Sequence, residues 1–358
     1  MNVDMPPPRT PEKYGGTIGL KNGVAAACRQ LAVCVCLHPW LAISLGCAVV
    51  TASWRRPSPP PVQKQMVVLA GDWQHNGAPI HVPVGTTLAF AGTARGAGGF
   101  TGAGTVRYDG AFHPGNSPAL ITYGGDVVLG TFLTLNMELG GLTRGTQYDA
   151  MNVAGKLTFG GTLNVTLINA WQPDLGNVYN LFDWGTTAGT FATVNLPALA
   201  VGRFWRTELL YVDGTLRVSP VPGTYAQWQA AFGTGAFGAD DDQDGIPNGI
   251  EFLLGTNPNA TTTPATPLTE LIPSTGGTVT ARVTFTIPEL PATDAHYRLR
   301  ASNDLVTWTL VASKDGLGPW TGSASVTTDP PAAGYNGVTV TETLPGTTTK
   351  RFHKLEAQ

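Results

Sequence analysis

Short alternating runs that follow a glycine are the feature that most constrains the fold of this chain. Four of them occupy residues 85–90, 130–135, 161–165 and 214–218, and each begins with Gly-Thr before apolar residues alternate with others. Alternation with a period of two places one set of side chains on the inner face of a strand and the other set outside. Many short strands separated by glycine turns predict a mainly β fold, with a β-helix, a sandwich or a barrel left open.

Composition narrows the class of protein further. The chain has 358 residues, which favours two or three domains. With 45 glycines, 28 prolines and 13% charged residues, it fits neither a coiled coil nor a highly charged disordered chain. A formal net charge of −3 gives no reason to expect a nucleic acid partner.

The N-terminal segment has the pattern of a secretory signal. Residues 31–52 read LAVCVCLHPWLAISLGCAVVTA, an apolar run that follows the basic residues Lys21 and Arg29. Small residues at its end predict cleavage after Ala52, so residues 1–52 are expected to be a signal peptide. Two alternatives remain open. The run is long enough to stay as an uncleaved membrane anchor, or a lipoprotein could be cut at Cys47.

All four cysteines, Cys28, Cys34, Cys36 and Cys47, lie in this N-terminal segment. After cleavage the chain would therefore have no thiol, which leaves neither a disulfide framework nor a cysteine-ligated metal site. Residues 53–64 follow, and their RRPSPPP run predicts an extended spacer. These features predict a secreted or cell-surface protein whose contact with the membrane is limited to an uncleaved N-terminal segment.

Residues 65–220 contain motifs that resemble a known family. HPGNSPAL at residues 113–120, ELGG at 138–141, GTQYD at 145–149 and FATVNLP at 191–197 resemble the pattern of autotransporter-associated β-strand repeats in large secreted bacterial proteins. That family usually has Gly where this chain has Ala119. The resemblance implies the closing turns of a right-handed parallel β-helix and a role in surface display or adhesion.

The acids of this module give little indication of catalysis. They are spread along the sequence, and the pair most suited to acid–base chemistry is Tyr148 with Asp149. The alternative is a turn, because Asp tolerates turn geometry and Tyr packs on the strands. No enzyme activity is therefore expected. The histidines His75, His81 and His113 lack the spacing of a metal site and are expected at the surface.

The sharpest local signal is the segment DDDQDGIPNGIE at residues 240–251. Acidic residues at loop positions one, three and five, a glycine at six and a glutamate at twelve fit the twelve-residue calcium loop at every specified position. Calcium binds six to eight hard oxygen atoms, and alternate residues of a tight loop converge on such an ion. The expected calcium ligands are Asp240, Asp242, Asp244, the carbonyl of Ile246, Asn248 and Glu251.

Charge supports a bound cation in this loop. No Lys or Arg occurs between Val218 and Ala281, and two carboxylates about 4 Å apart repel by roughly 4 kcal/mol at an effective dielectric near 20. The alternative is a solvated acidic turn in which the charges splay apart. DGIPN at residues 244–248 and GTNP at 255–258 resemble thrombospondin type 3 repeats and dockerin loops, which implies a structural Ca²⁺ linker.

Short helices are expected on both sides of the loop. Residues 225–232 can form one helix with its aromatic residues on one side, and residues 250–254 can form another that Gly255 stops. Residues 223–262 are therefore predicted to be a helical calcium-loop linker between two β modules.

Residues 268–358 are predicted to form a β-sandwich. Residues 279–287 alternate cleanly, and further strands are expected at residues 297–301, 308–311, 338–341 and 351–355. YRLRASNDL at residues 297–305, followed by Trp308, resembles a terminal module found after such calcium linkers. Trp308 and Trp320 could stack on sugars, although core packing is the commoner role of such residues.

Together these features predict an exported, non-enzymatic structural or adhesion protein with a structural calcium site. Cell-surface or extracellular polysaccharide is the expected kind of partner. One alternative is a carbohydrate-binding accessory protein, and another is a β-helix enzyme that degrades polysaccharides.

Overall fold

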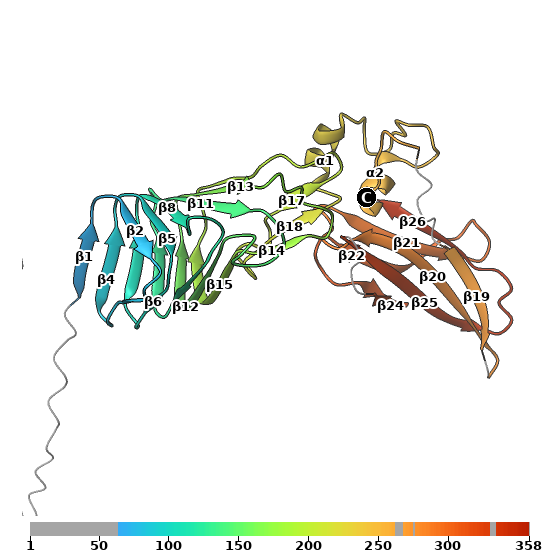
Figure 1. Cartoon of the computed structure of the whole chain (residues 1–358). Helices are drawn as coiled ribbons and strands as arrows, with labels where there is room; N and C mark the ends of the chain where they lie inside the picture. Colours follow the sequence, from blue (N-terminus) through green and yellow to red (C-terminus); the bar gives the residue numbers. More distant parts are fainter. Residues whose placement is uncertain (1–63, 262–267, 275, 330–333, 358) are drawn as a thin grey trace, which may run out of the picture. The chain divides into compact units, whose positions relative to one another are not determined.

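A computed structural model of the chain describes residues 64–261, 268–274, 276–329 and 334–357 (Figure 1). The fold is mainly β, as predicted, with two parallel sheets, three antiparallel sheets and two short helices among these residues. The predicted signal peptide at residues 1–52 and the spacer at residues 53–64, apart from Lys64, lie outside the described residues. Among the described helices, none is both long and apolar enough to cross a membrane.

The first module is a parallel coil in which the chain returns to the same face after three strands, giving a β-helix-like arrangement. One face lies in the nine-stranded sheet and contains β1 (Gln65–Leu69), β4 (Thr86–Phe90), β7 (Thr105–Tyr108) and β10 (Asp126–Leu129). The long strand β12 (Ala150–Phe159) joins this face to a second face of the same sheet, which contains β3 (Ile80–His81), β6 (Phe100–Thr101) and β9 (Leu120–Tyr123). The strand β15 (Phe182–Gly189) pairs with β12 along both faces. The six-stranded sheet forms the third face, with β2 (Trp73–Asn76), β5 (Ala94–Ala97), β8 (Ala111–Pro114), β11 (Thr134–Leu139), β13 (Thr162–Leu167) and β16 (Thr193–Asn195).

Alternating side chains fill the interior of this coil. In β11, Leu135, Met137 and Leu139 are fully buried, and Leu163 and Val165 of β13 lie beside the first two. Aromatic rings continue the stack towards the N-terminal turns, for example the stacked rings of Phe90, Tyr108 and Phe112. Burying one large apolar side chain stabilises a fold by about 1.5–3 kcal/mol, so this interior is the main source of stability of the coil.

One predicted strand begins later than the sequence pattern suggested. Residues 130–135 were expected to form a strand, but β11 starts only at Thr134 and the Phe132 side chain is 85% exposed. Gly130, Thr131 and Phe132 instead form the turn that precedes β11, because the coil needs a bend between its faces at this point.

A three-stranded antiparallel sheet follows the coil. It contains β14 (Val178–Asn180), β17 (Phe204–Arg206) and β18 (Thr215–Ser219), with β18 in the middle. Tyr179, Leu216 and Val218 of this sheet belong to the same hydrophobic core as the coil. The change from parallel to antiparallel pairing ends the repeated turns.

The first helix has the predicted bounds, and the second begins at Asn248, two residues before the predicted start. α1 (Tyr225–Phe232) begins after Thr224, whose hydroxyl accepts the amide of Gln227, and ends at Gly233 in the left-handed conformation. α2 (Asn248–Leu254) ends at Gly255, which also has a positive φ of 72°. The acidic loop therefore leads directly into α2.

The second β module is a sandwich of two four-stranded antiparallel sheets. One sheet contains β19 (Leu268–Ser274), β20 (Thr278–Pro288), β24 (Ser325–Thr328) and β25 (Tyr335–Pro345). The other contains β21 (His296–Ser302), β22 (Thr309–Asp315), β23 (Thr321–Gly322) and β26 (Phe352–Ala357).

The helical segment shares the hydrophobic core of this sandwich. Trp228 of α1 and Phe252 and Leu253 of α2 pack in one buried cluster with Val283 and Leu299 of the sandwich strands. The Tyr297 hydroxyl donates a hydrogen bond to the Leu253 carbonyl at 2.9 Å. The segment predicted as a linker is therefore also part of the packing of the sandwich.

Arg206 connects the three-stranded sheet to the segment that precedes β21. Its side chain is only 1% exposed. The guanidinium donates to the carbonyls of Leu290 and Pro291, to the more distant carbonyl of Val221 and to the carboxylate of Glu208. A planar guanidinium with five N–H donors suits such a set of converging oxygens.

Candidate functional site

Three carboxylates of the acidic loop converge. One oxygen from each of Asp240, Asp242 and Asp244 lies within 4.8 Å of the other two. The loop holds this shape through short side-chain contacts: the amide of Gly245 donates to Asp240 Oδ2 at 2.9 Å, and the amide of Ile246 donates to Asp244 Oδ1 at 2.8 Å. Gly245 has a φ of 90°, a conformation that favours glycine, as the calcium-loop pattern requires at position six.

Glu251 supplies a fourth carboxylate from α2. The residue is fully buried, and its Oε2 atom has no hydrogen-bond partner, while Oε1 makes only a long contact of 3.4 Å with the Thr256 hydroxyl. Burial and the negative charges of Asp242, Asp244 and Asp240 together raise the pKa of Glu251 to about 7. A buried carboxyl group beside three others is unfavourable unless a cation offsets the charge.

The oxygen atoms at this site fit a hard divalent cation. Asp240 Oδ1 and Asp242 Oδ2 are buried and, like Glu251 Oε2, have no hydrogen-bond partner among the described residues. Calcium and magnesium are bound by such oxygens, and calcium tolerates irregular geometry better because it takes six to eight ligands. The four carboxylates and the open oxygen atoms are therefore compatible with the predicted Ca²⁺ ligands Asp240, Asp242, Asp244 and Glu251.

The two remaining predicted ligands are placed differently. Asn248 is fully buried, its Nδ2 donates to the Ala236 carbonyl at 3.2 Å, and its Oδ1 accepts the amide of Asp241 at 3.4 Å. The Asn248 side chain thus helps to fold the loop, and its coordination of calcium stays a prediction. Coordination by the Ile246 carbonyl also stays a prediction.

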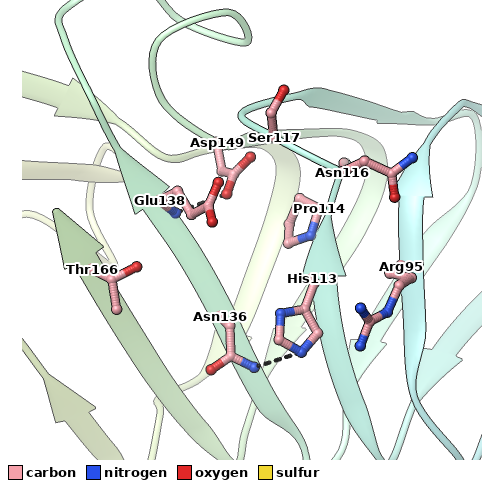
Figure 2. A pocket seen from close by; sticks show the side chains of 10 residues that line it. Arg95, His113, Pro114, Asn116, Ser117, Asn136, Glu138, Asp149 and Thr166 are labelled. Carbon is pink, nitrogen blue, oxygen red and sulfur yellow. Dashed lines mark hydrogen bonds between the residues drawn. The ribbon is translucent and has the colours of Figure 1, made fainter. Parts of the chain in front are cut away.

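A second candidate site is a polar cleft of about 350 Å³ over the six-stranded sheet (Figure 2). Its lining comes from β5, β8, β11, β13 and the adjoining loops. The lining residues are Arg95, His113, Pro114, Gly115, Asn116, Ser117, Asn136, Glu138, Asp149 and Thr166.

Asp149 holds together two segments at this cleft. It is 1% exposed, and its two carboxylate oxygens accept the amides of Ala119 at 2.7 Å and Glu138 at 2.8 Å. Burial, opposed by the two amide hydrogen bonds and reinforced by the charge of Glu138, raises the pKa of Asp149 to about 7. These contacts give Asp149 a structural role in the turn.

Spacing alone does not predict that Glu138 and Asp149 share a site, because the acids of the coil are spread along the chain. In the structure both line the same cleft, and Figure 2 shows them on one side of it. The cause is an antiparallel return of the chain between them: Leu139 pairs with Tyr148, and the Asp149 amide donates to the Glu138 carbonyl at 3.0 Å.

Of the three histidines predicted to lie at the surface, one is buried. All three were expected at the surface, but His75 is 5% exposed and packs edge-on against Trp73 and Phe100. His75 is a core residue because its ring continues the aromatic stack at the N-terminal turn. His81 is exposed and contacts the Thr101 hydroxyl, whereas His113 lies in the polar cleft.

The two tryptophans considered for sugar stacking are both engaged by protein groups. The Lys354 ammonium lies 4.5 Å from the centre of the Trp308 ring. The Trp320 ring packs against Phe285 and Tyr297, with centroid distances of 6.1 and 5.8 Å. Trp320 thus packs against the sandwich core, whereas Trp308 is half-buried beside Lys354, and sugar stacking by either ring stays a prediction.

No protein-family model, no curated protein and no solved structure matches this chain. The class of the protein therefore rests on its fold and its sites. It is a mainly β protein in which a parallel coil precedes a helical acidic loop and an antiparallel sandwich.

Proposed function

We propose that the chain is an exported, non-enzymatic structural or adhesion protein in which a Ca²⁺ ion stabilises the acidic loop. The observation that carries the calcium site is Glu251, a fully buried carboxyl group whose Oε2 has no hydrogen-bond partner and which lies beside three aspartates. A cation that binds these oxygens offsets their repulsion and completes their coordination.

The position of the loop indicates what the ion stabilises. The C-terminal part of the loop continues into α2, and α2 packs into the core of the sandwich through Phe252 and Leu253. Isolated extracellular calcium modules bind the ion with Kd values of about 10⁻⁴ to 10⁻³ M. At a free calcium concentration about ten times Kd, binding stabilises the folded state by about 1.4 kcal/mol.

Export is supported by the signal-like segment at residues 31–52 and by the need for a weak site to be filled where calcium is plentiful. A structural rather than catalytic role of the coil is supported by Asp149, because both of its carboxylate oxygens accept backbone amides and hold the turn. A sugar-binding role through Trp308 and Trp320 has weaker support because protein groups already contact both rings.

Limited proteolysis tests this proposal. In the wild-type chain, cleavage within residues 233–262 should slow when millimolar calcium replaces a chelator. Asp242→Asn should lose this protection, whereas Glu270→Gln, which removes an exposed carboxylate of β19, should keep it. Equal cleavage in chelator and in calcium would contradict the proposed role of the ion.

A further inference from the structure

The polar cleft carries two side-chain charges of opposite sign that the protein leaves uncompensated. Among the described residues, neither the Arg95 guanidinium nor the Glu138 carboxylate forms a hydrogen bond or an ion pair. Elsewhere on the chain arginines do find carboxylates, for example Arg107 with Asp109 at 2.6 Å. Arg95 therefore stands out, because every other described arginine of the coil and its three-stranded sheet pairs with a carboxylate.

Strand register explains why Arg95 and Glu138 do not pair with each other. Arg95 of β5 lies beside His113 of β8, and the pairing of β8 with β11 places Glu138 two residues beyond the position opposite His113. Two strand spacings and two residues along a strand separate the Cα atoms of Arg95 and Glu138 by about 12 Å. Figure 2 shows the two side chains on opposite sides of the cleft, with His113 between them.

A row of side-chain amides fixes His113 at the floor of the cleft. Asn195 donates to Asn164 at 2.8 Å, Asn164 donates to Asn136 at 3.0 Å, and the Asn136 amide lies 3.4 Å from His113 Nε2. Because the Asn136 amide nitrogen is a donor, Nε2 is the acceptor and the proton of a neutral His113 is on Nδ1. Burial and the charge of Arg95 lower the pKa of His113, which favours this neutral form.

The lining also limits the kind of ligand. Apart from the His113 ring, none of the ten lining residues is aromatic, so the cleft offers no large stacking surface for a sugar ring. It offers a cation at one side, an anion at the other and hydroxyl and amide groups between them. Its volume of about 350 Å³ is at the lower end of the range for small-molecule sites.

We propose that this cleft binds a small zwitterion whose carboxylate pairs with Arg95 and whose ammonium group, separated from the carboxylate by a spacer of several atoms, pairs with Glu138. An α-amino acid is too short to contact both side chains at once. An ω-amino acid or a dipeptide has the required separation of charges. The binding site is independent of the calcium loop, because the coil supplies every lining residue.

Ligand-detected NMR titrations of the full chain test this proposal. The probes are glycine, γ-aminobutyrate and ε-aminocaproate, with N-acetyl-ε-aminocaproate and ε-aminocaproamide as matched probes that lack one charge. We expect ε-aminocaproate to bind most tightly and each singly charged probe to bind about tenfold more weakly, since one lost ion pair of about 1.4 kcal/mol corresponds to that factor.

Variants locate the site. Arg95→Gln should bind ε-aminocaproate and ε-aminocaproamide with similar affinity, and Glu138→Gln should bind ε-aminocaproate and its N-acetyl derivative with similar affinity. Lys156→Gln, which removes an exposed charge of β12 outside the cleft, should behave like the wild type. Thermal unfolding of each variant checks that the fold is retained.

Several results would overturn the proposal. These are no binding of ε-aminocaproate, equal affinity for all five probes, tighter binding of the neutral sugar cellobiose, or unchanged affinities in Arg95→Gln and Glu138→Gln. Each of these outcomes leaves the calcium proposal untouched, because proteolysis of residues 233–262 measures that proposal separately.

Discussion

Replacement of Arg206 by methionine tests whether the coil and the sandwich unfold together. Methionine keeps much of the apolar stem of arginine and removes the guanidinium, so the change isolates the polar contacts. The wild-type guanidinium donates to the carbonyls of Leu290 and Pro291, and at 3.4 Å to that of Val221. All three carbonyls belong to buried residues.

The expected cost follows from these contacts. A buried polar group that loses its partner costs about 1–3 kcal/mol, and removal of one member of a buried charged network costs about 3–5 kcal/mol. We therefore expect Arg206→Met to lower the free energy of unfolding by about 3–5 kcal/mol. Arg206→Lys should be intermediate, because an ammonium group cannot reach all of these oxygens at once.

Urea unfolding followed by tryptophan fluorescence measures this loss. The matched control is Arg203→Met, which removes an arginine that is 27% exposed and pairs with Asp174 at 2.9 Å. The control also loses a hydrogen bond to the Pro173 carbonyl at 2.7 Å, so it should cost about 1–2 kcal/mol, less than Arg206→Met. The wild-type chain should unfold in one transition and Arg206→Met in two. If Arg206→Met loses no more stability than Arg203→Met, the assigned role of Arg206 is wrong.

Variants at three further positions test other parts of the structure. Burial raises the pKa of Asp149 to about 7, so the folded state favours the protonated carboxyl group. Up to about 4 kcal/mol of stability that is present near pH 4 should therefore be lost as the pH rises to about 7. Urea titrations should show this pH dependence in the wild type, and an equal pH dependence in Asp149→Asn would contradict it. Tyr297→Phe removes the hydrogen bond to Leu253 and should lower the unfolding free energy by about 1–2 kcal/mol; an unchanged melting temperature would argue against that contact. Leu157→Ala should lower the free energy of unfolding by about 2–5 kcal/mol, because Leu157 is fully buried in the coil. In the same urea assay, Leu157→Met should lower it by less than about 1.5 kcal/mol. Similar losses for both variants would show that the site is loosely packed.

Sequence alone predicted the strands whose alternation is local. The runs at residues 161–165 and 214–218 correspond to β13 and β18, and the run at residues 279–287 lies within β20. In β13 and β20 the period of two identifies the buried face without knowledge of the partner strand, whereas β18 is buried on both faces. The strand predicted at residues 130–135 begins only at Thr134, because Phe132 is an apolar residue in an exposed turn.

Pairing between strands three apart could not be predicted in the same way. The coil closes because β1 pairs with β4 and β4 with β7. The turns between these strands differ in length, so no fixed repeat length appears in the sequence. The sequence is therefore compatible with a β-helix, a sandwich or a barrel, and only the strand registers identify the β-helix-like arrangement.

The two candidate sites differ in how well the sequence predicts them, and the reason is again whether their residues are close in sequence. The acidic loop is local, since residues 240–251 contain all the predicted ligands at a fixed spacing. The polar cleft is not local, because Arg95 and Glu138 come together only through the registers of three strands. The packing of Trp228 and Phe252 into the sandwich core was missed because it joins segments predicted as separate units.

Calorimetric titration with calcium tests the central claim most directly. We predict that the wild-type chain binds one Ca²⁺ ion with a Kd of about 10⁻⁴ to 10⁻³ M. Glu251→Gln, which removes the buried carboxylate of the loop, should show no such binding, and Glu270→Gln should bind as the wild type does. An absence of calcium-dependent heat in the wild-type chain, or equal binding by Glu251→Gln, would contradict the account.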